Sequence, residues 1–202
     1  MFEIFSHRML FNGIENNDES IPYFDKLNIG IELDLRLGKD GAYVSHDVTD
    51  NGILFQKICE KVSKTNLRMA LHIKEFEVIE EVIKLLKKYS LTNFFMFNTE
   101  DYNLRKFIEN ENIASYVTKK PDDVKTELLW CDEIGENWYT KELITNLHKQ
   151  NKILYGMSLE LIKSCNENEV YREWTRLVNL GIDGICTKYP EKLQMFVKGD
   201  LN

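Results

Sequence analysis

Short apolar runs alternate along the chain with longer segments in which apolar side chains recur every three or four residues. The runs have the length of buried β-strands, and the longer segments have the periodicity of amphipathic α-helices. The runs predict a strand that begins near Ile29 and further strands over Phe2–Ser6, Ala42–Ser45, Leu67–Ile73, Asn93–Phe97, Ile113–Val117, Glu127–Cys131, Ile153–Met157 and Ile182–Cys186.

The periodic segments predict helices between most of these strands. One helix follows a cap at Asp18 or Ser20, and another begins at Asn51. The clearest helix covers Glu75–Tyr89, where apolar and charged side chains lie on opposite faces. Further helices are predicted over Asp101–Glu109, Thr140–Gln150 and Glu167–Leu180, and from Pro190 onward.

This alternation predicts an α/β protein with a parallel sheet, because most of the strands are continuous apolar runs that helices must cover on both faces. About eight strand–helix units indicate a compact (β/α)8 TIM barrel, although 202 residues is near the small end for that fold. The alternative is an open doubly wound sheet. No glycine-rich phosphate loop follows a strand, which counts against a nucleotide-binding version of that alternative. We expect a single domain over residues 1–202.

Composition narrows the class of protein. The net charge of −7 argues against a nucleic-acid partner, which would favour a basic surplus. The four cysteines are widely spaced, so we expect free thiols in a reducing compartment. The N-terminus lacks a secretory leader pattern, and no apolar stretch has the length of an integral membrane segment. We therefore expect a cytoplasmic protein, with its oligomeric state left open.

The strand near Ile29 carries two carboxylates, Glu32 and Asp34. Side chains two residues apart in a strand share a face, so the two acids lie side by side. Buried carboxylates are costly unless they are paired or hold a cation. A tight turn at 39–41 then brings His46 back towards them. The stretch predicts a site for a hard divalent cation with an acid/base group beside it.

Other polar residues fall at strand ends, where a barrel of this type has its active site. His7 and Arg8 close the first strand, and His72 and Lys74 share a face of another. Salt bridges from Arg8, Arg36 or Lys74 to the two acids, without a metal, are the competing interpretation. We expect Glu133 to shape a loop, and Trp130 and Trp138 to be packing or pocket-wall residues rather than specific ligands. Asp132 could likewise cap or shape a loop, or add negative charge to the site. We expect no catalytic role for His148.

Together these motifs resemble the glycerophosphodiester phosphodiesterases, within the phosphatidylinositol-phospholipase-C-like barrel superfamily. That family has His-Arg after the first strand, then Glu-Asn, Glu-x-Asp in an apolar strand, a Lys-Asp-Gly turn and His-Asp. Its last strand reads Gly-x-Asp-Gly-Ile-x-Thr, followed by Pro. The matching positions here are His7-Arg8, Glu15-Asn16, Glu32-Leu33-Asp34, Lys39-Asp40-Gly41, His46-Asp47, Gly181–Thr187 and Pro190.

The chain departs from the family pattern in three places. Met9 stands where the family has glycine, and His72 stands where it has a metal-binding glutamate, although Lys74 is kept. Only about twenty residues separate Asp47 from the next strand, so the family's small insertion after the second strand is mostly missing. A more open site is expected, and glycerol specificity does not transfer.

The resemblance implies metal-dependent hydrolysis of a small-molecule phosphodiester to an alcohol and a phosphomonoester. His7 and His46 would be the general acid and base, in an order that the sequence leaves open. The other implied roles are metal binding by Glu32, Asp34 and His72, phosphate binding by Arg8 and Lys74, and orientation of a histidine or a metal ligand by Glu15 and Asn16. The metal would be one Mg²⁺ or Ca²⁺ ion, with Mn²⁺ as a further option.

Two rival functions remain. One is a phospholipase-D-like or inositol-phospholipid-type diesterase of the same superfamily. The other is a non-catalytic phosphate-binding relic, for which the changes at Met9 and His72 leave room and against which the presence of both His7 and His46 argues.

Overall fold

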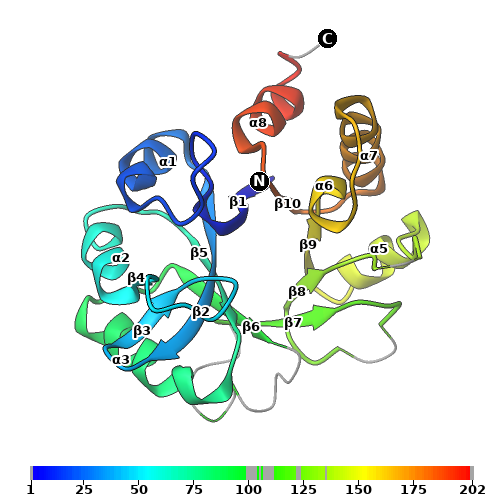
Figure 1. The fold of residues 1–202 in the computed structure, drawn as a ribbon. Helices are drawn as coiled ribbons and strands as arrows, with labels where there is room; N and C mark the ends of the chain where they lie inside the picture. The colour runs from blue at the N-terminus through cyan, green and yellow to red at the C-terminus, as the bar shows by residue number, and fades with distance from the viewer. Residues whose placement is uncertain are drawn as a thin grey trace.

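A computed structural model describes residues 2–98, 104, 106, 112–121, 124–134 and 136–200. Eight parallel strands form a closed ring, in which the last strand pairs with the first and the first with the second (Figure 1). In ring order they are β1 (Glu3–Ser6), β2 (Gly30–Gly38), β5 (Met69–Ile73), β6 (Phe94–Asn98), β7 (Ile113–Val117), β8 (Leu128–Cys131), β9 (Ile153–Met157) and β10 (Gly184–Thr187). The predicted α/β TIM barrel is confirmed, and the open doubly wound sheet is wrong.

Helices surround the ring on the outside (Figure 1). They are α1 (Ile21–Leu27), α2 (Phe55–Val62), α3 (Ile79–Lys88), α5 (Lys141–His148), α7 (Glu167–Leu180) and α8 (Pro190–Lys198), with a short α6 (Leu159–Ile162) that the sequence did not predict. Local signals explain the ends of α7. Asn166 and Glu169 form a reciprocal capping box, and Gly181 ends the helix in the left-handed conformation. The helix predicted over Asp101–Glu109 lies outside the described residues, apart from Leu104 and Lys106.

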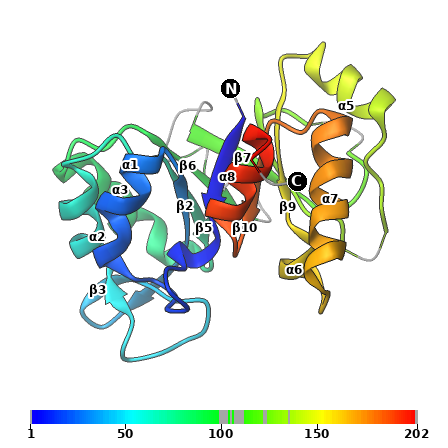
Figure 2. The same cartoon turned by 90° about the horizontal axis from the view of Figure 1, so that it is seen from above.

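The segment after Asp47 folds differently from the prediction. A helix was expected from Asn51, but Ile53 and Leu54 form strand β4 (Ile53–Leu54) and α2 starts only at Phe55. Strand β4 pairs with β3 (Gly41–Val44), which pairs antiparallel with the end of β2. Strand pairing therefore overrides the helical spacing of these two apolar residues. Figure 2 shows β3 beyond the ends of the barrel strands, and no larger insertion separates it from α2.

Alternation along each strand divides the core into two clusters. Ile31, Leu33 and Leu35 of β2 face the helices, while Glu32 and Asp34 lie on the other face, inside the ring. Large side chains fill the ring interior, and most of them are aromatic. They include Phe5, Phe95, Phe97, Trp130 and Tyr155. The barrel is therefore a packed core with a solid floor beneath its mouth, rather than a channel.

Two further observations concern the cysteines and the length of the helices. All four cysteines are free, as predicted. Within the described ranges, every helix is too short or too polar to cross a membrane.

Candidate functional site

A pocket of about 170 Å³ opens at the carboxyl ends of the barrel strands. Because all eight strands run parallel, the residues that end or follow them meet at this mouth. The lining residues are His7, Arg8, Glu32, Asp34, His46, His72, Lys74, Phe97, Tyr116, Trp130, Asp132, Met157 and Leu161. Every residue that the sequence singled out for metal, phosphate or acid/base roles thus lines one pocket. Only the two orienting candidates, Glu15 and Asn16, lie outside its lining.

The acids and one histidine form a compact group. The β2–β5 register places Asp34 directly beside His72, and Glu32 precedes Asp34 on the same face. Both carboxylates are only 3% exposed. One ligand atom from each of Glu32, Asp34 and His72 lies within 4.8 Å of the others. Two carboxylate oxygens and an imidazole nitrogen suit a divalent cation, so this donor set fits the predicted metal.

The two acids have opposite pKa shifts. Burial and the neighbouring Asp34 raise the pKa of Glu32 to about 8, although the backbone N–H of Arg8 donates to its Oε2 at 2.9 Å. Burial also acts to raise the pKa of Asp34, but the hydrogen bond and charge of His72, and then the charges of Lys74 and Arg8, outweigh it and lower that pKa. Such separated pKa values in a cleft are characteristic of functional sites.

Two cationic side chains lie against Asp34. Arg8 Nε is 3.4 Å from Asp34 Oδ2, and Lys74 Nζ is 3.4 Å from Oδ1. Arg8 Nη1 also donates to both carboxylate oxygens of Glu15, at 3.1 and 3.3 Å. Glu15 thus contacts Arg8 rather than a histidine or a metal ligand. Asn16 acts through its backbone, because its N–H donates to the Arg8 carbonyl at 2.7 Å.

The turn after β1 has an uncommon backbone conformation. Arg8 has φ of 50° and Met9 has φ of 45°, in the left-handed region that favours glycine. This turn aims the Arg8 N–H at Glu32. Met9 occupies the position where the resembling family has glycine, and its side chain is completely buried in the core. Glycine would adopt this backbone conformation without strain. In this chain the position is instead filled by a methionine whose side chain packs in the core.

The two predicted catalytic histidines occupy different environments. His7 is largely buried, with Nε2 3.9 Å from Glu32 Oε2, and burial followed by the charge of Arg8 lowers its pKa to about 3. Its Nδ1 is buried without a hydrogen-bond partner in the described structure. His46 is 44% exposed, and its Nδ1 lies 2.8 Å from Asp47 Oδ1. Both side chains reach the same pocket.

Aromatic rings form the floor of the pocket. Phe97 stacks between His72 and Trp130, with ring centroids 4.7 and 4.6 Å away. The sequence did not single out Phe97, Tyr116, Met157 or Leu161 as pocket residues. These four residues lie at or shortly after the ends of strands. That position indicates a pocket residue only once the strands are known to close into a barrel.

The weaker candidates lie outside the compact group. Asp132 follows β8, across the ring from β2, and its Oδ2 accepts from the Tyr116 hydroxyl at 3.3 Å. Glu133 accepts from the Tyr139 N–H at 2.6 Å and pairs with Arg176, so it shapes the loop as expected. His148 lies in α5 and pairs with Asp183.

Comparison with known proteins adds information only at the level of structure. No family model matches the sequence, and no curated protein matches it. Two solved structures of glycerophosphodiester phosphodiesterases from Parabacteroides distasonis ATCC 8503 are similar to this chain, with TM-scores of 0.77 and 0.74 at 12% and 14% identity. Both alignments cover 100% of this chain, and they cover 98% and 88% of the respective relatives.

A calcium-dependent phosphoinositol-specific phospholipase C from the Gram-negative bacterium Pseudomonas sp. is also similar. Its TM-score is 0.62 at 8% identity, and the alignment covers 94% of this chain and 89% of that one. Identities this low establish the fold alone. The resemblance read from the sequence motifs is therefore confirmed as a structural one: the chain has the barrel fold of the glycerophosphodiester phosphodiesterases over its full length, and it shares this fold with the phosphoinositol-specific phospholipase C over 94% of its length.

Proposed function

We propose that this protein is a metal-dependent phosphodiester hydrolase, similar to the glycerophosphodiester phosphodiesterases, that cleaves a small diester to an alcohol and a phosphomonoester. One observation carries the proposal. The three-residue ligand group of Glu32, Asp34 and His72 shares a single pocket with two further histidines and two cationic side chains. Metal ligands, acid/base groups and phosphate-binding cations are the kinds of group that metal-dependent diester hydrolysis uses.

Glu32, Asp34 and His72 would hold one divalent ion, Mg²⁺ or Ca²⁺, with Mn²⁺ as a further option. The calcium dependence of the similar phospholipase C supports including Ca²⁺. When bound, such an ion supplies positive charge next to the negative charge that develops on the phosphate. His72 replaces a carboxylate with a neutral ligand, so the site carries less negative charge and favours somewhat softer ions than three acids would.

Arg8 and Lys74 would bind the phosphate oxygens through charge-assisted hydrogen bonds. Both cations lie 3.4 Å from Asp34 and are largely buried, which places their positive charge at the edge of the ligand group. Glu15 holds the Arg8 guanidinium from the other side. A diester anion at this edge would therefore be bound in one orientation.

His7 and His46 would act as general base and general acid. A neutral imidazole at one side of the phosphorus can accept the proton of the nucleophile, either water or a neighbouring substrate hydroxyl. A protonated imidazole at the other side can donate to the leaving alcohol oxygen. Burial lowers the pKa of His7 and so favours its neutral imidazole near pH 7, the form from which a base accepts a proton. Substitution of either histidine tests its assignment.

A pocket of about 170 Å³ favours compact alcohol groups, since sites for larger organic ligands are commonly about 300 Å³ or more. The rival with structural support is an inositol-phospholipid-type diesterase, because a phosphoinositol-specific phospholipase C shares the fold. A phospholipase-D-like activity and a phosphate-binding relic are two further candidate functions. The single domain over 1–202, the cytoplasmic location and the absence of a nucleic-acid partner stay predictions.

Product analysis tests the proposed function. Glycerophosphodiesters and phosphoinositides would be incubated with the protein and each metal, and the products followed by phosphorus NMR. A phosphomonoester as the final product supports the proposal, whereas an accumulating cyclic phosphate from the inositol lipid supports the rival. Absence of any product from folded, metal-loaded protein would favour the phosphate-binding relic.

A further inference from the structure

Strand β2 extends past the barrel and carries an arginine above the ligand group. It pairs with β5 as far as Leu35 and then continues only as a partner of β3, up to Gly38. Arg36 is the first residue past the last β5 pairing, two positions after Asp34. The proposed function gives Arg36 no role, yet its side chain is largely buried and fully engaged.

The Arg36 guanidinium holds the backbone of His46. Its Nε and Nη2 both donate to the His46 carbonyl oxygen, at 3.0 and 2.8 Å. Its third contact is Nη1 to Glu75 Oε2 at 2.8 Å. The planar fork of arginine makes this geometry, which a lysine ammonium cannot reproduce.

Glu75 completes a clasp between two strands. Its second oxygen, Oε1, accepts from the Leu37 N–H at 2.7 Å, just beyond the last residue of β2 that pairs with β5. Glu75 directly follows Lys74, whose own N–H donates to the Leu35 carbonyl at 3.1 Å. The clasp therefore fixes the backbone around Lys74 and His46 to the same strand that carries Glu32 and Asp34.

Among the described residues, few other contacts hold His46 in place. The preceding residue is anchored by a hydrogen bond from the Ser45 N–H to the Asp34 carbonyl at 3.0 Å. The imidazole itself is held by Asp47, whose side chain is 90% exposed, and exposed pairs of this kind contribute little. Two charge-assisted bonds from a buried arginine are stronger, so Arg36 is the principal restraint on the His46 carbonyl.

We propose that Arg36, supported by Glu75, is a positioning residue that sets the place of His46 over the pocket. The inference rests on the proposed function, because it assigns His46 a catalytic task. A displacement of about 1 Å at a catalytic group lowers turnover by about 100-fold. Loss of the clasp should therefore reduce kcat and leave KM nearly unchanged, since Arg36 does not line the pocket.

The test is a double-mutant cycle with a diester substrate. Arg36→Met should lower kcat by about 10- to 100-fold, with KM altered less than about twofold. In a His46→Ala background the same substitution should cost less than about twofold, because the positioned group is gone. Arg36→Lys should recover only part of the loss. Equal losses in both backgrounds, or an unchanged kcat, would overturn the inference.

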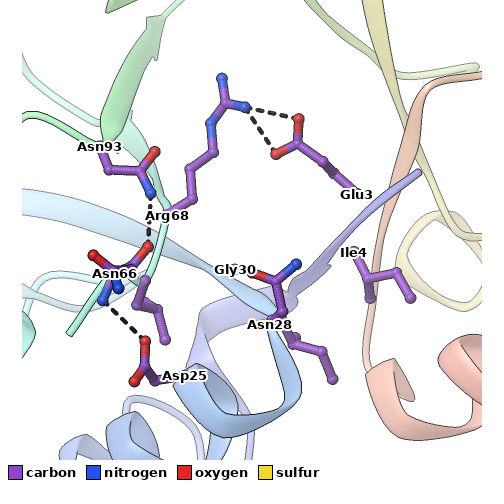
Figure 3. Close-up of a pocket in the computed structure, with 10 residues that line it drawn as sticks. Glu3, Ile4, Asp25, Asn28, Gly30, Asn66, Arg68 and Asn93 are labelled. Atoms are coloured by element: carbon purple, nitrogen blue, oxygen red, sulfur yellow. Dashed lines mark hydrogen bonds and ion pairs between the residues drawn. The ribbon is translucent and has the colours of Figure 1, made fainter. Parts of the chain in front are cut away.

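Two further variants guard against misfolding. Glu75→Gln keeps an acceptor for the Leu37 N–H but loses the charge that binds Arg36, so kcat should fall by less than in Arg36→Met, in protein that melts cooperatively. Arg68→Met is the matched control, because Arg68 pairs with Glu3 at the opposite end of the barrel (Figure 3). Its kcat should equal that of the wild type. If Arg68→Met lowered kcat as much as Arg36→Met does, the positioning role of Arg36 would be contradicted.

A structural measurement separates this inference from the proposed function. If the wild type cleaves no diester, the proposed function fails, and amide hydrogen exchange still tests the clasp. Arg36→Met should speed exchange at residues 45–50 at least about tenfold, and Arg68→Met should not. Unchanged exchange in this segment would overturn the positioning role whatever the outcome of the assays.

Discussion

The two ends of the barrel carry similar polar residues in different arrangements. At the amino end, a pocket of about 310 Å³ contains the ion pair of Arg68 and Glu3 (Figure 3). Arg68 Nη1 contacts both Glu3 oxygens, at 2.7 and 2.8 Å, and the Tyr155 hydroxyl donates to Oε1 at 2.8 Å. Nearby, Asn93 donates to the Asn66 carbonyl at 2.7 Å. These polar groups bind one another.

At the carboxyl end, acidic, basic and histidine side chains lie close together, but they do not form separate one-to-one ion pairs. Glu32 and Asp34 are neighbours inside the ring, and the two cations contact only Asp34 of this pair through their side chains. His7 has a buried ring nitrogen without a partner in the described structure. Buried groups of this kind cost stability unless something further binds to them.

The two pockets differ in their polar groups more than their volumes would suggest. The amino-end pocket is the larger, yet its charges are neutralised within the protein, as expected where a barrel end serves stability. The smaller, carboxyl-end pocket contains the neighbouring acids and the His7 ring nitrogen that has no partner in the described structure. Substitutions at the two ends should therefore have separable effects, on activity at one end and on folding stability at the other.

The largest effect is expected from removing both acids. Glu32→Gln combined with Asp34→Asn should abolish divalent-metal binding and diester turnover, because two of the three proposed ligands lose their charge. The fold should persist, because glutamine and asparagine keep the size of the two acids and one acceptor oxygen each. Calorimetry with Ca²⁺ and Mg²⁺, alongside circular dichroism, measures both. Unchanged metal binding in this variant would refute the ligand assignment.

The next effect concerns the histidines. His7→Ala and His46→Ala should each lower kcat by about two to four orders of magnitude, the usual contribution of a general acid or base. Metal binding should survive, because neither histidine belongs to the ligand group. Steady-state kinetics with a chromogenic diester measures the loss. Wild-type rates in both variants would remove these residues from the mechanism.

A smaller change is expected at His72. His72→Glu adds a third carboxylate to the ligand group and should tighten Ca²⁺ binding by about tenfold, because affinity for hard cations rises with ligand charge. His72→Gln is the matched variant without added charge and should bind more weakly than His72→Glu. Calorimetric titration compares the two. Equal affinities would show that this side chain does not reach the ion.

The smallest catalytic effect is expected at the amino end. Arg68→Met removes the Glu3 ion pair and the contacts of the guanidinium with the Phe95 and Tyr155 rings. The loss should lower the free energy of unfolding by about 1–2 kcal/mol, as expected for a partly buried ion pair with cation–π contacts. Urea unfolding measures this. An unchanged stability would argue that the amino-end network is dispensable.

Much of the mouth could be predicted because strand periodicity is local. Residues two apart in a strand share a face, so Glu32 and Asp34 had to lie together, as had His72 and Lys74. Parallel strands then brought the two pairs into one place, through the register of Asp34 with His72. Motif spacing added His7 and His46.

Features that depend on contacts between residues far apart in the chain could not be predicted from the sequence. Ile53 and Leu54 have helical spacing, yet β3 recruits them as a strand. Glu15 pairs with Arg8 because of the left-handed turn at Arg8, and the residue types in this turn do not predict that conformation. The contact of Arg36 with the His46 carbonyl requires the hairpin to fold back to a particular register. Such long-range geometry is fixed by packing rather than by local propensity.

The most direct test is turnover of bis-p-nitrophenyl phosphate by EDTA-treated protein, before and after separate additions of Mg²⁺, Ca²⁺ and Mn²⁺. We predict that EDTA abolishes p-nitrophenol release and that at least one ion restores it in the wild type. The variant with Glu32→Gln and Asp34→Asn should stay inactive with every ion. Full turnover in EDTA, or restoration of the double variant by an added ion, would contradict the metal-dependent site at the barrel mouth.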